Sequence, residues 1–228
     1  NDLKKQNLGE DDLASLVIQQ VEFCNMILLN KASDVTPDEL KRITSILREI
    51  QPKAEIIPCD YGNVDLDKII NTHLFDFEKV ATSARWIEAV EGDEHDLENE
   101  EEGEALEYGI GTFVYQRRKP FNLTEFDQLV ARLWPKSVIR CKGICYFSNE
   151  KDSCYLFEQA GKQVSLTQAG AWYATMPADE LEDFKKKNPS ILRDWDDEYG
   201  DRMQKLVFIG QDMDREAIET LLDNCLEK

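Results

Sequence analysis

The sequence predicts an α/β segment followed by an α+β domain, and three observations support this prediction. Residues 13–84 carry helix and strand patterns in alternation, which is the order that builds a parallel sheet with crossover helices. From residue 108 onwards, several strand patterns follow one another, and helices flank them, as in a mainly antiparallel sheet with helices on one face. Between these parts, residues 88–107 contain eleven carboxylates and no Lys or Arg.

The charge and cysteine content limit the possible partners. The chain has 228 residues, a formal net charge of −19 and 42% hydrophobic residues, which suits a globular protein. Nucleic acids and anionic membrane surfaces are disfavoured as partners because binding to them depends on positive charge. No apolar run approaches the roughly 20 residues that a membrane helix needs. Six scattered cysteines in a chain of this size fit a reduced, cytoplasmic protein.

These patterns divide the chain into three parts. We expect residues 1–87 to form an α/β segment, residues 88–107 to form an acidic flexible linker, and residues 108–228 to form the α+β domain. A block of like charges stays solvated because it cannot bury enough apolar surface to offset the entropy of ordering. The opening residues, NDLKKQNLGEDD, look like an interior loop, so we expect the native protein to be longer than this chain.

The first part reads as helix, strand, helix, strand. Apolar residues recur at helical spacing over residues 13–23, and the run NMILL at 25–29 is typical of a buried parallel strand. Thr36, Pro37 and Glu39 form a strong helix start, with Thr36 as N-cap. A second strand follows at 54–58, so a right-handed βαβ unit is expected. The run LDKIINTHLFDFEKV is predicted to contain a further helix that includes His73.

The end of the first strand is the candidate binding site, because open parallel sheets bind ligands at the carboxyl ends of their strands. Asn30-Lys31-Ala32-Ser33-Asp34 stands there and resembles the guanine-specificity motif of GTPases, Asn-Lys-x-Asp. In that motif the Asn holds the loop, the Lys stem lies along the base, and the Asp accepts two N–H groups of guanine. Here Ser33 occupies the Asp position, and Asp34 comes one residue late. The alternative interpretation is a polar turn without a ligand.

The second part is expected to contain five strands and two main helices. Strands are predicted at 110–116, 137–147, 154–159, 164–168 and 205–210, with a turn at 148–152. Asn122 and Glu125 form the cap signature of one helix, and an amphipathic helix at 216–226 closes the chain.

No residue of this chain is assigned a catalytic or metal-binding role. Cys141 and Cys145 lie on one predicted strand, about 13 Å apart at about 3.3 Å per residue. Two thiolates on one zinc must lie within about 4.6 Å of each other, so the pair does not suit chelation. The basic residues at 117–119 are interpreted as charges capping a strand end, with pairing to the acidic linker or phosphate binding as alternatives. His95, in the linker, is the remaining histidine.

Segments from both parts of the chain resemble the same protein family. The segments VIQQVEFCNMILLNK, IIPCDYG and LDKIINTHLFDFEKV are similar to the CobW family of P-loop GTPases, and YGIGTFVYQRRKPFN, LWPKSVIRCKGICYF, QAGAWYATMP and GDRMQKLVFIGQDMDREAIETLLDNCL resemble successive blocks of the CobW C-terminal domain. The resemblance implies a partial P-loop-type sheet followed by a domain for partner recognition. It implies GTP and Mg²⁺ as cofactors, with the phosphate-binding P-loop outside this chain, and zinc or another transition metal as the metal that is handled.

Two functional hypotheses follow. In the first, the chain is the C-terminal portion of a GTP-dependent metal chaperone, in which Asn30 and Lys31 contact the base. Its partner would be a client metalloprotein or its own N-terminal GTPase half, and the chain alone would not hydrolyse GTP. In the second, it is a protein-interaction module without nucleotide function. Besides these two, a third hypothesis is that the carboxylates of residues 88–107 buffer divalent cations. The sequence leaves open which metal, which client and which oligomeric state apply.

Overall fold

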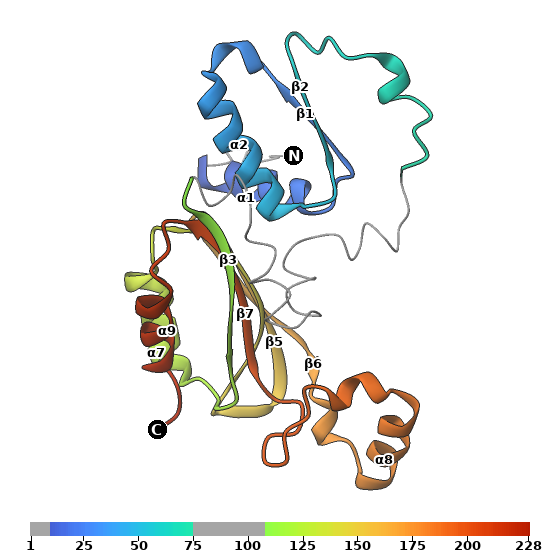
Figure 1. The fold of residues 1–228 in the computed structure, drawn as a ribbon. Coiled ribbons are helices and arrows are strands. Elements are labelled where there is room, and N and C mark those ends of the chain that lie inside the picture. Colours follow the sequence, from blue (N-terminus) through green and yellow to red (C-terminus); the bar gives the residue numbers. More distant parts are fainter. Residues whose placement is uncertain (1–9, 75–107) are drawn as a thin grey trace, which may run out of the picture.

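The computed structural model describes residues 10–74 and 108–228 (Figure 1). The acidic linker predicted at 88–107, and with it the boundary at residue 87, lies outside the described residues. The described residues form a two-stranded parallel sheet with its helices, and a five-stranded antiparallel sheet with its own helices. The predicted fold class is therefore confirmed.

The first part is the βαβ unit that the sequence predicts. Helix α1 (Glu10–Glu22) leads into strand β1 (Met26–Asn30), helix α2 (Pro37–Ile50) and strand β2 (Glu55–Cys59). The strands pair in parallel from Met26 opposite Glu55 to Asn30 opposite Cys59, so both carboxyl ends reach the same edge. Thr36 caps α2 as predicted, because its Oγ1 accepts the N–H of Glu39 at 3.2 Å.

The segment after β2 differs from the sequence prediction. Instead of a helix that includes His73, the described residues contain a short 3₁₀ turn, Leu66–Lys68, and His73 lies beyond it with a positive φ of 50°. The turn is held by Asp65, whose carboxylate accepts the N–H of Asp67 at 3.1 Å. This local side-chain bond competes with helix formation, and a periodicity argument does not detect it.

The second part is a twisted antiparallel sheet with strand order β3-β7-β4-β5-β6 (Figure 1). Its strands are β3 (Ile110–Arg117), β4 (Val138–Phe147), β5 (Glu150–Ala160), β6 (Gln163–Ala171) and β7 (Gln204–Gln211). Strand β5 begins inside the turn predicted at 148–152, because Phe147 pairs directly with Glu150 and the connection needs only two residues. All neighbouring pairs are antiparallel.

Helices cover one face of this sheet. Helix α7 (Leu123–Gln128) continues into a π-helical turn, Leu129–Leu133, and α9 (Arg215–Asp223) packs beside it (Figure 1). Asn122 caps α7 as predicted and accepts the N–H groups of Thr124 and Glu125. Helix α8 (Ala178–Lys187) lies near the far end of β6. The core between helices and sheet is rich in aromatic residues, among them Phe113, Phe121, Phe126, Phe147, Phe157 and Phe208.

The face of the antiparallel sheet that α7 and α9 do not cover is directed away from this core. Along β4, Cys141 and Cys145 belong to the helix-covered core, whereas Arg140 and Lys142 lie at the alternate positions. On β3, the hydroxyl of Thr112 donates to Glu49 of α2 at 2.8 Å. Arg42 of α2 also donates to Gln211, at the end of β7, at 3.0 Å. The face without α7 and α9 therefore contacts the first part of the chain.

Candidate functional site

The loops at the carboxyl edge of β1 and β2 are joined by Asn30. Its Oδ1 accepts the backbone N–H of Gly62 at 3.0 Å, and the Cys59 thiol lies 3.8 Å from the same oxygen. Asn30 therefore ties the loop after β1 to the loop after β2. The next residue, Lys31, is exposed and adopts the left-handed conformation, with φ 62° and ψ 36°. The sequence-predicted pair thus lies at the edge where open α/β sheets bind ligands.

Ser33 and Asp60 make a second connection across the same edge. Oδ1 of Asp60 accepts both the backbone N–H of Ser33, at 3.0 Å, and its hydroxyl, at 2.8 Å. Sequence reasoning did not single out Asp60, which is 27 residues from Ser33. The available signal was its position two residues after the strand predicted at 54–58.

The same edge carries two non-glycine residues in the left-handed region. Besides Lys31, Tyr61 has φ 52°, and its side chain is fully exposed. Such conformations cost about 1–3 kcal/mol each and concentrate at ligand sites. A rigid loop with an exposed Lys, an exposed Tyr and a fixed carboxylate can bind a planar polar ligand through stacking and hydrogen bonds.

A buried ion pair joins α1 to the antiparallel sheet. Arg140 of β4 donates to both carboxylate oxygens of Glu22, at 2.6 and 3.0 Å, and each residue is only 1% exposed. Arg140 also donates to the carbonyl of Gln159, and Gln51, at the end of α2, donates to the Glu22 carbonyl at 2.8 Å. Because Glu22 lies four residues before β1, this contact connects the segment that leads to Asn30 with the second part.

Glu158 of β5 extends the network. Its Oε1 lies 2.7 Å from Nζ of Lys142 and 3.2 Å from Nη2 of Arg140. Burial raises the pKa of this carboxyl, but the hydrogen bond and charge of Lys142, together with Arg140, outweigh burial and hold the pKa below its usual value. Lys142 also lies over the ring of Phe23, with Nζ 5.9 Å from the ring centroid.

The lowered pKa of Glu158 makes the free energy of unfolding depend on pH. A carboxyl whose pKa is lower in the folded state contributes stability above its unfolded pKa, and that contribution is lost as pH falls through the folded pKa. We expect Glu158→Gln to make the free energy of unfolding fall less than in the wild type between about pH 6 and about pH 3. Urea unfolding at several pH values measures this. Equal losses in both proteins would contradict the assignment.

The cysteines of β4 are core residues. Cys141 and Cys145 are fully buried, and burial raises the pKa of both thiols. Thiols in this state are poor metal ligands because the thiolate is the binding form. In the part of the chain that the structure describes, no three His, Cys, Asp or Glu side chains gather in an arrangement that could hold a metal ion.

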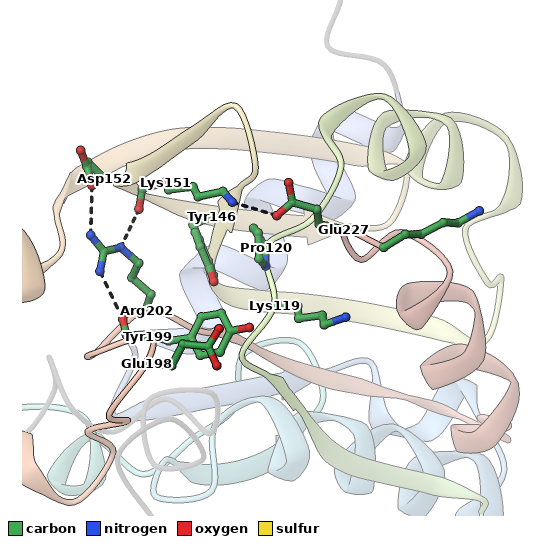
Figure 2. A pocket seen from close by; sticks show the side chains of 10 residues that line it. Lys119, Pro120, Tyr146, Lys151, Asp152, Glu198, Tyr199, Arg202 and Glu227 are labelled. Carbon is green, nitrogen blue, oxygen red and sulfur yellow. Dashed lines mark hydrogen bonds and ion pairs between the residues drawn. The ribbon is translucent and has the colours of Figure 1, made fainter.

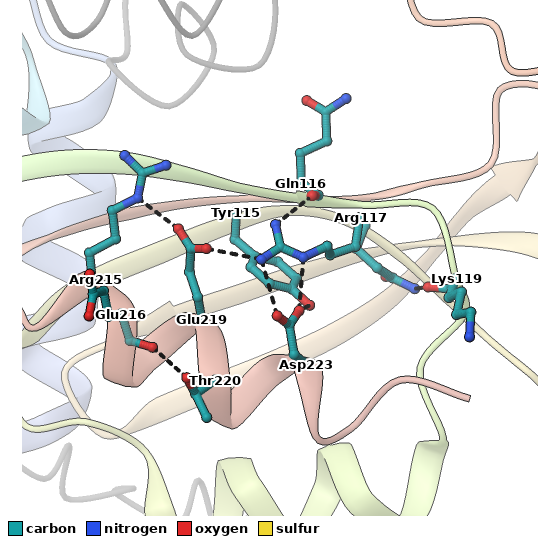
Figure 3. Close-up of polar contacts among 10 residues, drawn as sticks. Tyr115, Gln116, Arg117, Lys119, Arg215, Glu216, Glu219, Thr220 and Asp223 are labelled. Atoms are coloured by element: carbon teal, nitrogen blue, oxygen red, sulfur yellow. Dashed lines mark hydrogen bonds and ion pairs between the residues drawn. The ribbon is translucent and has the colours of Figure 1, made fainter. Parts of the chain in front are cut away.

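Two residues of the basic cluster at 117–119, Arg117 and Arg118, bond to other segments of the second part. Arg117 forms bonds of 2.9 Å to both Glu219 and Asp223 of α9 (Figure 3). Tyr115 donates its hydroxyl to the same Asp223 at 2.8 Å. Arg118 donates to backbone carbonyls, including that of Asp194 at 2.6 Å. These contacts fasten α9 and the loop before β7 to the sheet.

A cavity of about 520 Å³ lies between the loop that precedes β7 and the last residues of the chain. Tyr146, Tyr199 and Lys119 line it, together with two ion pairs (Figure 2). Arg202 binds Asp152 at 3.0 Å, and Lys151 binds Glu227 at 2.9 Å. Its charged groups thus largely neutralise one another.

Comparison with known proteins identifies the family to which the chain belongs. Parallel strands with a polar loop at their carboxyl edge, joined to an antiparallel α+β domain, define a two-part α/β and α+β protein. The family model described as "Cobalamin synthesis protein cobW C-terminal domain" matches residues 110–226, which is half of the chain. The chain belongs to the CobW family.

Relatives extend the similarity beyond that domain. The chain is 32% identical over 228 residues to zinc-regulated GTPase metalloprotein activator 1 of Dictyostelium discoideum, covering 99% of this chain and 46% of the relative. It is 25% identical over 182 residues to a zinc chaperone of Mycobacterium tuberculosis, covering 77% of this chain and 41% of that relative. The chain therefore spans less than half the length of these relatives.

Among solved structures, the Zn(II)-bound YjiA GTPase from E. coli aligns with a TM-score of 0.43 and 18% identity, over 96% of this chain and 57% of that one.

Across residues 10–74 and 108–228, no helix has both the length and the apolar character needed to cross a bilayer.

Proposed function

We propose that this chain is the C-terminal portion of a GTP-dependent zinc chaperone of the CobW type. Two relatives support the proposal through their names, a zinc-regulated GTPase metalloprotein activator and a zinc chaperone. In this proposal, residues 1–87 are the back part of the GTPase unit, residues 88–107 are the flexible linker, and residues 108–228 recognise the client metalloprotein. The protein acts in the cytoplasm, and GTP with Mg²⁺ binds together with a phosphate-binding segment outside this chain.

The observation that carries the proposal is the position of Asn30. Its side chain joins the two loops at the carboxyl edge of the parallel sheet, which is the loop-holding role that the Asn-Lys-x-Asp resemblance assigns to it. The adjacent Lys31 is exposed in a left-handed conformation, so its stem is available to a base. Asn30 and Lys31 are therefore the proposed base-contacting residues.

The buried ion pair of Glu22 and Arg140 supports a coupling between nucleotide binding in the first part and client binding in the second part. A change in α1 on nucleotide binding would act directly on β4, because the pair joins these elements across 118 residues of sequence. We propose that the nucleotide state reaches the client-binding domain through this contact. Neither residue needs to touch the nucleotide for such coupling.

Replacement of Asn30 tests the nucleotide role. In the protein encoded by the complete reading frame, we expect Asn30→Ala to weaken GTP binding by about 10- to 100-fold, because Gly62 loses its acceptor and the two loops separate. Equilibrium titration with a fluorescent GTP analogue measures this. Asn63→Ala, an exposed amide in the same loop, is the matched control and should leave the affinity unchanged. If both variants bind GTP like the wild type, the base-loop assignment is wrong.

A protein-interaction module without nucleotide function is the second candidate. Ser33 at the position of the motif's Asp favours it, since a hydroxyl does not replace a bidentate carboxylate. The complete reading frame distinguishes the two functions. A GxxxxGK[ST] sequence upstream supports the GTPase, and its absence there supports the interaction module.

A further inference from the structure

Asp60 places a carboxylate beside Ser33, the residue that occupies the position of the Asp in the Asn-Lys-x-Asp motif. Asp60 follows β2 directly, and its Oδ1 accepts both the N–H and the hydroxyl of Ser33, at 3.0 and 2.8 Å. Two donors on one oxygen fix the orientation of the carboxylate. Within the described residues, no hydrogen bond occupies its second oxygen, Oδ2.

The bond to Asp60 also determines whether the Ser33 hydroxyl can donate or accept a hydrogen bond from a ligand. Because its hydroxyl proton is donated to Asp60, the Ser33 oxygen is left as an acceptor. The pair therefore presents two neighbouring acceptors, the Ser33 oxygen and Oδ2 of Asp60. Guanine presents two neighbouring donors on its Watson–Crick edge, N1–H and the 2-amino group. Adenine lacks this pattern, since its N1 is an acceptor.

We propose that Asp60, oriented by Ser33, reads the base and gives the site its preference for guanine. The carboxylate that the Asn-Lys-x-Asp motif places on the first loop comes here from the second loop. Asn30 stabilises this arrangement, because its bond to Gly62 holds the loop that carries Asp60. The inference rests on the proposed nucleotide role of Asn30 and Lys31 and adds the residue that determines specificity.

A donor–acceptor exchange tests the proposal in the protein encoded by the complete reading frame. Asp60→Asn keeps the shape of the side chain but places an amide N–H₂ where an acceptor stood. We expect it to weaken GTP binding by about 100-fold and to strengthen binding of xanthosine triphosphate, whose C2 carbonyl accepts a hydrogen bond. Competition against a fluorescent nucleotide measures both affinities.

Asp34 provides the matched control, because it is the other carboxylate of this loop. Asp34→Asn should leave the ratio of GTP to xanthosine triphosphate affinity unchanged. A measurement on the wild type does not depend on how the variants fold. Inosine triphosphate lacks the 2-amino group and should bind about 10- to 100-fold more weakly than GTP.

The outcomes separate the two proposals. If the wild type prefers GTP but Asp60→Asn keeps that preference, or if Asp34→Asn changes it instead, Asp60 does not read the base, and the nucleotide function stands. Equal binding of inosine and guanosine triphosphates by the wild type overturns the inference in the same way. If the wild type binds no purine nucleotide, the proposed function fails, and this inference fails with it.

Discussion

Arg140→Ala is expected to lower the free energy of unfolding by about 3–5 kcal/mol. The substitution leaves Glu22, which is 1% exposed, as a buried carboxylate without its bidentate partner. Glu158 keeps Lys142 and is affected less. The cost comes mainly from the desolvated charge that remains, because a buried ion pair contributes little net stability while both partners are present. Urea denaturation followed by circular dichroism measures it.

A double substitution and a surface control identify the cause. Arg140→Met combined with Glu22→Leu removes both charges, so it should recover most of the lost stability. Lys186→Ala removes the exposed pairs with Glu182 and Asp183 and should cost less than about 1 kcal/mol. If the double variant is as unstable as Arg140→Ala, lost packing and not the unpaired carboxylate explains the effect.

Phe126→Ala is expected to cost about 3–5 kcal/mol. Phe126 is 3% exposed, and its ring lies 4.8 Å from that of Phe121, 5.7 Å from that of Phe147 and 5.2 Å from that of Phe157. Truncation leaves a cavity among these rings, which the sheet beneath cannot close. Because α7 is only six residues long, this ring is its main anchor on the sheet.

The same helix provides the control for Phe126. Leu123 is 42% exposed, so Leu123→Ala removes a comparable apolar side chain with little loss of buried surface. We expect it to cost less than about 1 kcal/mol. Thermal and urea unfolding of both variants give the comparison. Similar losses in the two variants would show that α7 is held by its cap and backbone rather than by the buried ring.

Local chemistry made much of the fold predictable. Thr36 and Asn122 were identified as caps because their side chains bond to N–H groups only two or three residues away. The strand at 110–116 was likewise recognised from a short run, and it spans Ile110–Arg117. The Asn30 loop was recognised because a polar pair follows an apolar strand. The contacts that decide the two caps lie within three residues of the capping residue. The strand and the Asn30 loop were recognised from local sequence patterns, although the partner of Asn30, Gly62, lies 32 residues later.

Contacts between distant segments were not predictable. Arg140 looks like an ordinary polar residue within a strand, and its partner Glu22 lies 118 residues earlier. Asp60 approaches Ser33 only because β1 and β2 are parallel and end at the same edge. The extended start of β5 reflects pairing with β4, whereas its sequence, SNEKD at 148–152, favours a turn. Tertiary pairing overrides local preference at such positions.

Nuclear magnetic resonance titration of this chain with guanosine diphosphate tests whether the carboxyl edge of β1 and β2 binds a base, because it detects weak binding and locates it. We expect the backbone amides that shift to lie in two loops, residues 30–34 and 60–62. Smaller shifts should follow at Glu22 and Arg140, through the buried contact. Shifts confined to other surfaces, or none at millimolar nucleotide, would contradict a base-binding role for this edge.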